Sequence, residues 1–61
     1  MLKLMLVTDR EVDGGVTGHR LVLVVGPWRH DTNMRFNYYE DASSEGHDMA
    51  SKLGVEFEET F

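Results

Sequence analysis

The stretch that decides the fold is LVLVVGPWRHDTNMRFNYY, residues 21–39. Its apolar run ends at Gly26-Pro27, and proline closes a strand because it cannot donate a ladder hydrogen bond. Beyond the proline, the sequence predicts a polar loop over residues 28–33 and a further strand over residues 34–39. Because the connection is short, we expect an antiparallel hairpin here.

Residues 28–31, WRHD, lie in this predicted loop and have two interpretations. In the first, they form a turn whose Trp28 packs against the edge of the sheet. In the second, Trp28 and Arg29 belong to a contact site, because Trp, Arg and Tyr dominate the energetics of protein interfaces. Tyr38 and Tyr39, at the far end of the same predicted hairpin, would complete that site.

Toward the N-terminus, residues 2–8 (LKLMLVT) show the two-residue alternation of a strand. Asp13-Gly14-Gly15 then gives a turn signal, because glycine adopts positive φ without a Cβ clash. A strand over residues 20–25 follows the turn. This order predicts a β-hairpin that precedes the hairpin described above.

Toward the C-terminus, residues 41–54 (DASSEGHDMASKLG) change to the period of a helix. The residues that share its apolar face are Ala42, Met49, Ala50 and Leu53. Gly46 lowers helix stability by about 1 kcal/mol relative to alanine, but its small size would let the helix lie close to a sheet. Residues 55–61 (VEFEETF) alternate again and predict a final, half-exposed strand.

The ends of the predicted helix are marked by capping residues. Gly54 stands where a C-terminal glycine belongs. Asp48 and Lys52 have the spacing of a favourable ion pair on one helical face. The candidate N-caps are Asp41, Ser43 and Ser44. Together the elements predict a single α+β domain over residues 1–61, with one helix and a small antiparallel sheet of about four strands in the order β-β-β-α-β.

Composition limits the classes of function. The 61 residues include no cysteine, which excludes disulfides and thiol catalysis and gives no sign of an oxidising compartment. The longest apolar run, residues 21–25, is too short to cross a bilayer, and the N-terminal segment reads as a strand. We therefore expect a soluble protein of the cytoplasm. The net charge of −5 argues against general binding to phosphate backbones.

The charge is distributed unevenly along the chain. Residues 1–39 carry five basic and four acidic side chains, a net charge of +1, whereas residues 40–61 carry one basic and seven acidic side chains, a net charge of −6. One interpretation is a solvated acidic surface that keeps a small protein soluble. The other is a surface for a charged partner.

The two long predicted strands are apolar on both faces, yet one helix covers only one face of a sheet. If the leucines pack under the helix, an apolar patch is left facing water on the other side, and such patches are usually interaction surfaces. This predicted self-association face consists of Met5, Val7, Val22 and Val24. Either a loop covers it, from residues 9–19 or around Trp28, or it pairs with a partner, most simply in a homodimer.

The sequence predicts no catalytic residue, metal site or cofactor. A metal site needs three or four converging ligands, and the three histidines, His19, His30 and His47, have no ligand spacing. No nucleophile elbow surrounds the serines, and the glycines of residues 13–18 lack the lysine of a phosphate-binding loop. We therefore expect a protein that is not an enzyme.

These observations predict a small acidic protein-binding module. It would act as an inhibitor or adaptor on a larger protein, for example as a phage-encoded modulator of host or defence proteins. The predicted contact residues are Trp28, Arg29, Tyr38, Tyr39, Glu45, Asp48, Glu56, Glu58 and Glu59. The alternative is a module that binds single-stranded nucleic acid by base stacking. Its platform would comprise Trp28, Arg29, Arg35 and Tyr38.

Overall fold

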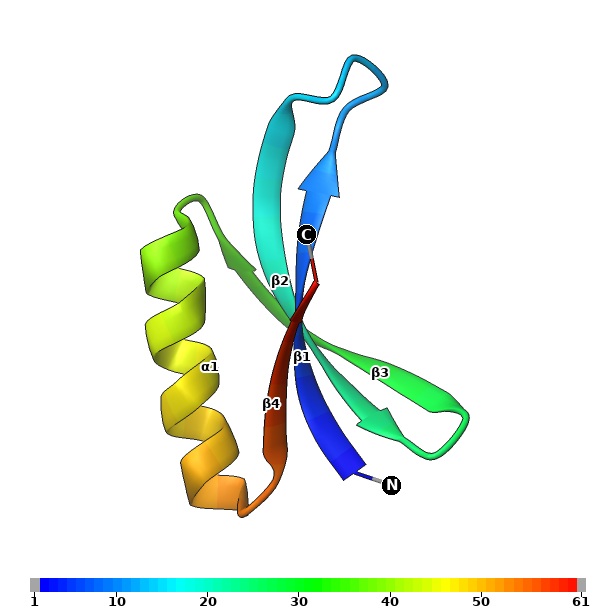
Figure 1. Ribbon diagram of the computed structural model, residues 1–61, viewed down its shortest axis with the longest axis vertical. Helices are drawn as coiled ribbons and strands as arrows, with labels where there is room; N and C mark the ends of the chain where they lie inside the picture. Colours follow the sequence, from blue (N-terminus) through cyan, green and yellow to red (C-terminus); the bar gives the residue numbers. More distant parts are fainter. Residues whose placement is uncertain (1, 61) are drawn as a thin grey trace.

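The computed structural model of the protein (Figure 1) describes residues 2–60. Its elements are β1 (Leu2–Arg10), β2 (Val16–Val25), β3 (Trp28–Phe36), α1 (Tyr39–Leu53) and β4 (Glu56–Thr60). The α+β class and the order β-β-β-α-β are those that the sequence predicts. Residues 1 and 61, which the predicted domain includes, lie outside the described residues.

The strands form one sheet in the order β3-β2-β1-β4. β1 pairs with β2, and β2 with β3, in antiparallel orientation. β4 pairs with β1 in parallel, so the sheet is mixed and not wholly antiparallel as expected. Parallel strands require a long crossover connection, and α1 provides it by running back along one face of the sheet (Figure 1).

β3 begins earlier than the sequence predicts, because the turn before it is only Gly26-Pro27. Val25 pairs directly with Trp28, and Gly26 has a φ of 57°, as the first central residue of a type II′ hairpin turn requires. The polar loop expected over residues 28–33 is therefore wrong, since these residues belong to the strand. Polar side chains are tolerated there because β3 lies at the edge of the sheet.

A bulge interrupts β3. Arg20 pairs with Arg35 and Val22 with Asp31, so β3 contains two more residues than β2 between these pairs. Within the bulge, Asn33 adopts a φ of 65° and donates its backbone N–H to Asp31 Oδ1 at 2.8 Å. Such bulges bend an edge strand and disrupt its pairing locally.

The helix begins at Tyr39, two residues before the first of the predicted caps. Tyr38 occupies the N-cap position without a side-chain hydrogen bond, so the candidate caps Asp41, Ser43 and Ser44 were wrong. The C-terminal end follows the prediction, because Gly54 is left-handed with a φ of 69°. The N–H of Val55 donates to the carbonyl of Ala50 at 3.0 Å, which completes the glycine cap.

The main core lies between α1 and the sheet. Its fully or nearly fully buried side chains are Leu4, Leu6, Leu21, Ala42 and Ala50. Gly46 also faces the sheet, where a Cβ would lie 2.6 Å from Cζ of Phe57 and 3.3 Å from Cδ2 of Leu21. The predicted close approach of the helix at this glycine is therefore confirmed.

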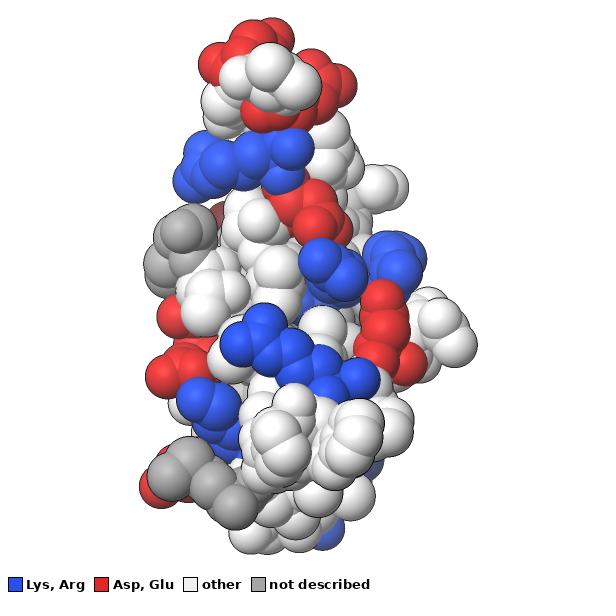
Figure 2. Space-filling view, turned by 90° about the vertical axis from the view of Figure 1, so that its right-hand side faces the viewer, with Lys and Arg blue, Asp and Glu red and all other residues white. Residues whose placement is uncertain are grey.

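The face of the sheet opposite α1, here called the open face, carries a second apolar cluster. It contains Met5, Val22 and Val24, which are 6%, 6% and 8% exposed, with the half-buried Val7 packed against them. The sequence predicts that these side chains face water unless a loop or a partner, most simply a second copy of the chain, covers them, and their burial by neighbours within one copy was not foreseen. In the sheet, several of their neighbours on adjacent strands are long charged residues. Figure 2 shows blue Lys and Arg side chains spread across this face. Aliphatic stems of such residues cover apolar surface while their charges stay in water.

The close approach at Gly46 gives a first prediction. Gly46→Ala is expected to lower the free energy of unfolding by about 1 kcal/mol net, measured by urea denaturation. The added methyl group must displace Phe57, and overpacking a core typically costs about 1–3 kcal/mol. Alanine's better helix propensity offsets about 1 kcal/mol of that cost.

The matched control is Ser44→Ala, an exposed position on the same helix. It is expected to leave stability within about 0.5 kcal/mol of the unsubstituted protein. A Gly46→Ala variant more stable than the unsubstituted protein would contradict the packing described here.

Candidate functional site

The register of the sheet arranges the open face in rows. One row contains Arg29, Val24, Lys3 and Glu56, and the next contains Asp31, Val22, Met5 and Glu58. A third row contains Arg35, Arg20, Val7 and Thr60. Most apolar side chains of the face therefore lie over β1 and β2, beside Lys3 and Arg20, and its two margins carry mainly charged side chains.

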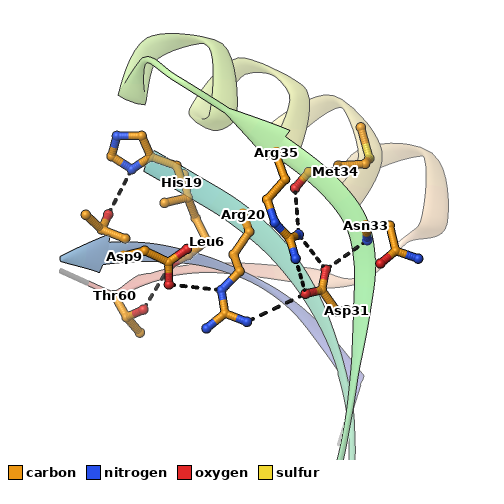
Figure 3. Close-up of polar contacts among 10 residues, drawn as sticks. Leu6, Asp9, His19, Arg20, Asp31, Asn33, Met34, Arg35 and Thr60 are labelled. Atoms are coloured by element: carbon orange, nitrogen blue, oxygen red, sulfur yellow. Dashed lines mark hydrogen bonds and ion pairs between the residues drawn. The ribbon is translucent and has the colours of Figure 1, made fainter. Parts of the chain in front are cut away.

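A chain of alternating charges crosses the open face from β1 to β3 (Figure 3). Arg20 Nε lies 3.1 Å from Asp9 Oδ1, and Arg20 Nη1 lies 3.6 Å from Asp31 Oδ2. Arg35 binds Asp31 with both terminal nitrogens, each at 2.9 Å. Bidentate guanidinium–carboxylate pairs of this kind combine charge with fixed geometry.

This geometry changes the acidity of Asp31. The hydrogen bonds from Arg35, followed by the backbone hydrogen bond from Asn33, lower the pKa of the Asp31 carboxyl from 3.8 to about 2. The carboxylate therefore keeps its charge under any ordinary condition. Arg35, which the sequence offered for the base-stacking platform, and Arg20 are both engaged within the chain.

Most acidic residues lie on α1 and β4, which pack side by side; Glu56 and Glu58 are at the β4 margin of the open face, and Glu59 is on the face that α1 covers. We call the acidic residues of α1 and β4 the acidic surface; it comprises Glu40, Asp41, Glu45, Asp48, Glu56, Glu58 and Glu59. The sequence analysis named five of these residues as contacts and missed Glu40 and Asp41. Their position in the first helical turn became clear only from the helix start at Tyr39.

Three members of the acidic surface have partners within the chain. Asp48 pairs with Lys52 at 2.9 Å, and Glu58 pairs with Lys3 at 2.8 Å. Glu59 accepts hydrogen bonds from the Tyr39 hydroxyl at 2.6 Å and from the Ser43 hydroxyl at 3.1 Å. The first of these raises the pKa of Tyr39.

The other four carboxylates of the acidic surface make no hydrogen bond or ion pair with any residue between 2 and 60. They are Glu40, Asp41, Glu45 and Glu56. Their carboxylates are therefore not engaged in a direct contact within residues 2–60, although the pKa of Lys52, raised mainly by Asp48, is also raised by the nearby Glu45.

The aromatic residues proposed as contacts are not brought together. Trp28 is 68% exposed at the start of β3, and Tyr38 is 67% exposed just after its end. Trp28 pairs with Val25 and Phe36 with His19, six positions apart on β2, so the length of β3 alone separates the two aromatic residues by roughly 20 Å. Tyr39 lies at the start of α1, edge-on to the buried His19 with 6.0 Å between ring centroids. The expected tryptophan plug is wrong, because Trp28 is neither in a loop nor covered.

The same separation affects the predicted base-stacking platform. Trp28 and Tyr38 lie at opposite ends of β3, and Arg35 is held by Asp31. Of the four platform residues, Trp28 and Arg29 are neighbours with side chains on opposite faces of the sheet.

Trp28 belongs to a row of exposed apolar residues that the sequence analysis did not recognise. On the face that α1 covers elsewhere, Leu2 pairs with Val25 and Val25 with Trp28. We call these three residues the end row. Their exposed fractions are 46%, 40% and 68%, since the tip of the β2–β3 hairpin turns away from α1 (Figure 1).

The histidines are dispersed. His19 Nδ1 is hydrogen-bonded to the Thr8 hydroxyl at 3.0 Å, and His47 packs on the Phe57 ring. No three His, Asp or Glu side chains among residues 2–60 are grouped to hold a metal ion. The described chain forms no pocket. No helix within residues 2–60 has both the length and the apolar character needed to cross a bilayer.

The lowered pKa of Asp31 gives a second prediction. Because its folded-state pKa is about 2 and its ordinary value is 3.8, the ion pair stabilises the fold above about pH 4. That stabilisation is lost as pH falls toward 2. Asp31→Asn is therefore expected to flatten the loss of thermal stability between pH 4 and pH 2.

The control is Asp41→Asn, at an exposed carboxyl without an ion pair. This variant should lose thermal stability between pH 4 and pH 2 as the unsubstituted protein does. The Asp31 carboxyl can also be followed directly by carbon NMR. A titration midpoint at or above 3.8 would show that the pair with Arg35 does not form in solution.

Comparison with known proteins gives no assignment. No protein-family model, curated protein or solved structure matches the chain. Its function is therefore inferred from the geometry and the charges of its own residues.

Proposed function

We propose that this protein is a small, non-catalytic protein-binding module that acts as an inhibitor or adaptor. Its acidic surface would approach a basic surface of a larger protein. The proposal keeps the cytoplasmic setting expected from the cysteine-free sequence.

The observation that carries the proposal is the separation of charge in space. α1 contains four acidic residues and Lys52, a net charge of −3, and β4 adds three acidic residues, for a total of −6. The segment from β1 to β3 contains five basic and four acidic residues, a net charge of +1. The negative charge is thus concentrated on α1 and β4.

Charge of this kind affects how quickly partners meet more than how tightly they hold. Complementary potentials steer diffusional encounter, and the gain in association rate falls as salt rises. Because Glu45 and Glu56 make no ion pair within residues 2–60, a partner does not have to break an internal contact to reach them. They are therefore the two positions at which the charge is best tested.

The third prediction compares two double variants with the same change of charge. Glu45→Gln with Glu56→Gln is expected to slow association with immobilised poly-L-lysine several-fold at low salt. Glu11→Gln with Asp13→Asn, in the turn between β1 and β2, is expected to slow it by less than about twofold. Stopped-flow or surface-binding measurements over a salt series give the rates.

Equal effects of the two double variants would show that only net charge matters, and this outcome would overturn the proposed surface. Binding that does not respond to salt would do the same. Quenching of Trp28 fluorescence by a single-stranded oligonucleotide at low salt would instead favour the nucleic-acid-binding alternative.

A further inference from the structure

We infer that the outer edge of β3 pairs with β3 of a second copy of this chain. The two strands would run antiparallel across a two-fold axis, with Arg29 of each copy opposite Asp31 of the other. The sheet would then continue through both copies. This inference is independent of the proposed function, because it uses the edge of the sheet opposite to β4.

The outward peptide groups of β3 follow from its hairpin. A two-residue turn makes Val25 and Trp28 a hydrogen-bonded pair, and bonded and non-bonded pairs alternate along an antiparallel ladder. The pairs Val24–Arg29 and Val22–Asp31 are therefore non-bonded. The N–H and C=O groups of Arg29 and Asp31 consequently point away from β2, toward the free edge.

An independent contact supports this assignment of bonded and non-bonded pairs between β2 and β3. The Thr32 hydroxyl donates to the carbonyl of Leu21 at 2.8 Å, so that carbonyl points from β2 toward β3. Bonded and non-bonded residues alternate along a strand, so the Leu21 carbonyl must point toward β3 if the neighbouring Val22–Asp31 pair is non-bonded. The bulge around Asn33 then ends the regular edge, which leaves Arg29 and Asp31 as its two outward residues.

Three registers would let the outward N–H and C=O groups of Arg29 and Asp31 in the two copies form hydrogen bonds. The charges of the side chains favour one of them. The first places Arg29 opposite Arg29, and the third places Asp31 opposite Asp31. Both bring like charges into direct opposition, which is destabilising. The middle register forms two symmetric Arg29–Asp31 pairs, and each pair exchanges two backbone hydrogen bonds.

The side chains are ready for this arrangement. Arg29 is exposed and makes no hydrogen bond or ion pair with any described residue. Asp31 is a carboxylate with its position fixed by Arg35. Arg29 and Asp31 share the open face, so a cross-strand contact between copies lies on one continuous surface.

The same register gives a role to the exposed tryptophan. His30 meets His30 of the second copy at the axis, and Trp28 lies diagonal to that histidine, within reach of an aromatic side chain. Trp28 and His30 are both exposed and both on the other face of β3. Pairing therefore shields Trp28 without any change in the fold.

The net charge of −5 per copy does not prevent this contact. Three strand spacings, about 14 Å, separate β3 from β4, and this exceeds the Debye length of about 10 Å at 0.1 M salt. The hairpin tip that carries Arg29 also projects away from α1 (Figure 1). The acidic residues of the two copies would lie at the outer margins of the joined sheet.

The fourth prediction concerns solution mass. Light scattering over a concentration series should show the mass rising from 7.0 kDa toward twice that value. Arg29→Asp replaces both attractive pairs with like charges and should weaken dimerisation about tenfold or more. Arg10→Asp makes the same change of charge at the far end of β1, and should leave dimerisation unchanged.

Hydrogen exchange of the unsubstituted protein tests the register without any variant. On dimerisation, the amides of Arg29 and Asp31 should exchange more slowly, while the amide of His30, bonded to β2 in either state, should not change. A mass of 7.0 kDa at every concentration would overturn the inference, as would a dimer whose Arg29 and Asp31 amides stay unprotected. If the protein is a monomer but the two double variants still differ in their association with poly-L-lysine, this inference is overturned and the proposed function stands.

Discussion

A single helix covers one face of this four-stranded sheet, and the rest of the structure depends on how the other face is closed. Two central strands that are apolar on both faces normally need a second layer. Here Met5, Val22 and Val24 are buried by their own neighbours in the sheet. Long charged side chains stand beside them on adjacent strands, and aliphatic stems of this kind cover apolar surface while their charges stay in water.

The way in which the open face is closed affects where charged side chains lie on the protein. Two cations of the open face are held by carboxylates, since Asp9 binds Arg20 from the neighbouring strand and Asp31 binds Arg35 within β3. Glu56 and Glu58 lie at the β4 margin of the same face, and most of the excess negative charge of the molecule lies on α1 and β4. The ion pairs of the open face and the negative charge of α1 and β4 therefore both belong to the description of how a sheet with one helix is completed.

Local pattern was sufficient to predict the class of fold. The alternation in residues 2–8, the glycines at residues 14–15 and the helical period after residue 41 identified their elements. Gly46 and Gly54 also have the roles that their small size and free φ suggested. Such features depend on a few neighbouring residues, and sequence reasoning handles them well.

Features that depend on pairing between strands were missed. The polar start of β3 looked like a loop because an edge strand needs no apolar alternation. The burial of Met5 and Val22 depends on which side chains stand beside them, and the register and the bulge at Asn33 decide that. For the same reason, Trp28 and Tyr38 were grouped by their closeness in sequence to one predicted hairpin, although β3 holds them apart. Residue types alone suggest candidate contact residues, but only the strand register shows which of them lie together on one surface.

The parallel pairing of β1 with β4 also fixes the order in which the fold can be completed. β1, β2 and β3 are joined by short turns, and such local contacts form quickly. Lys3 pairs with Glu56, a separation of 53 positions that closes a much longer loop. During folding, β1 is therefore an unprotected edge until the last strand arrives. β1 and β4 must meet to finish the sheet, so a chain that lacks β4 would leave β1, an inner strand of the complete sheet, as an unpaired edge.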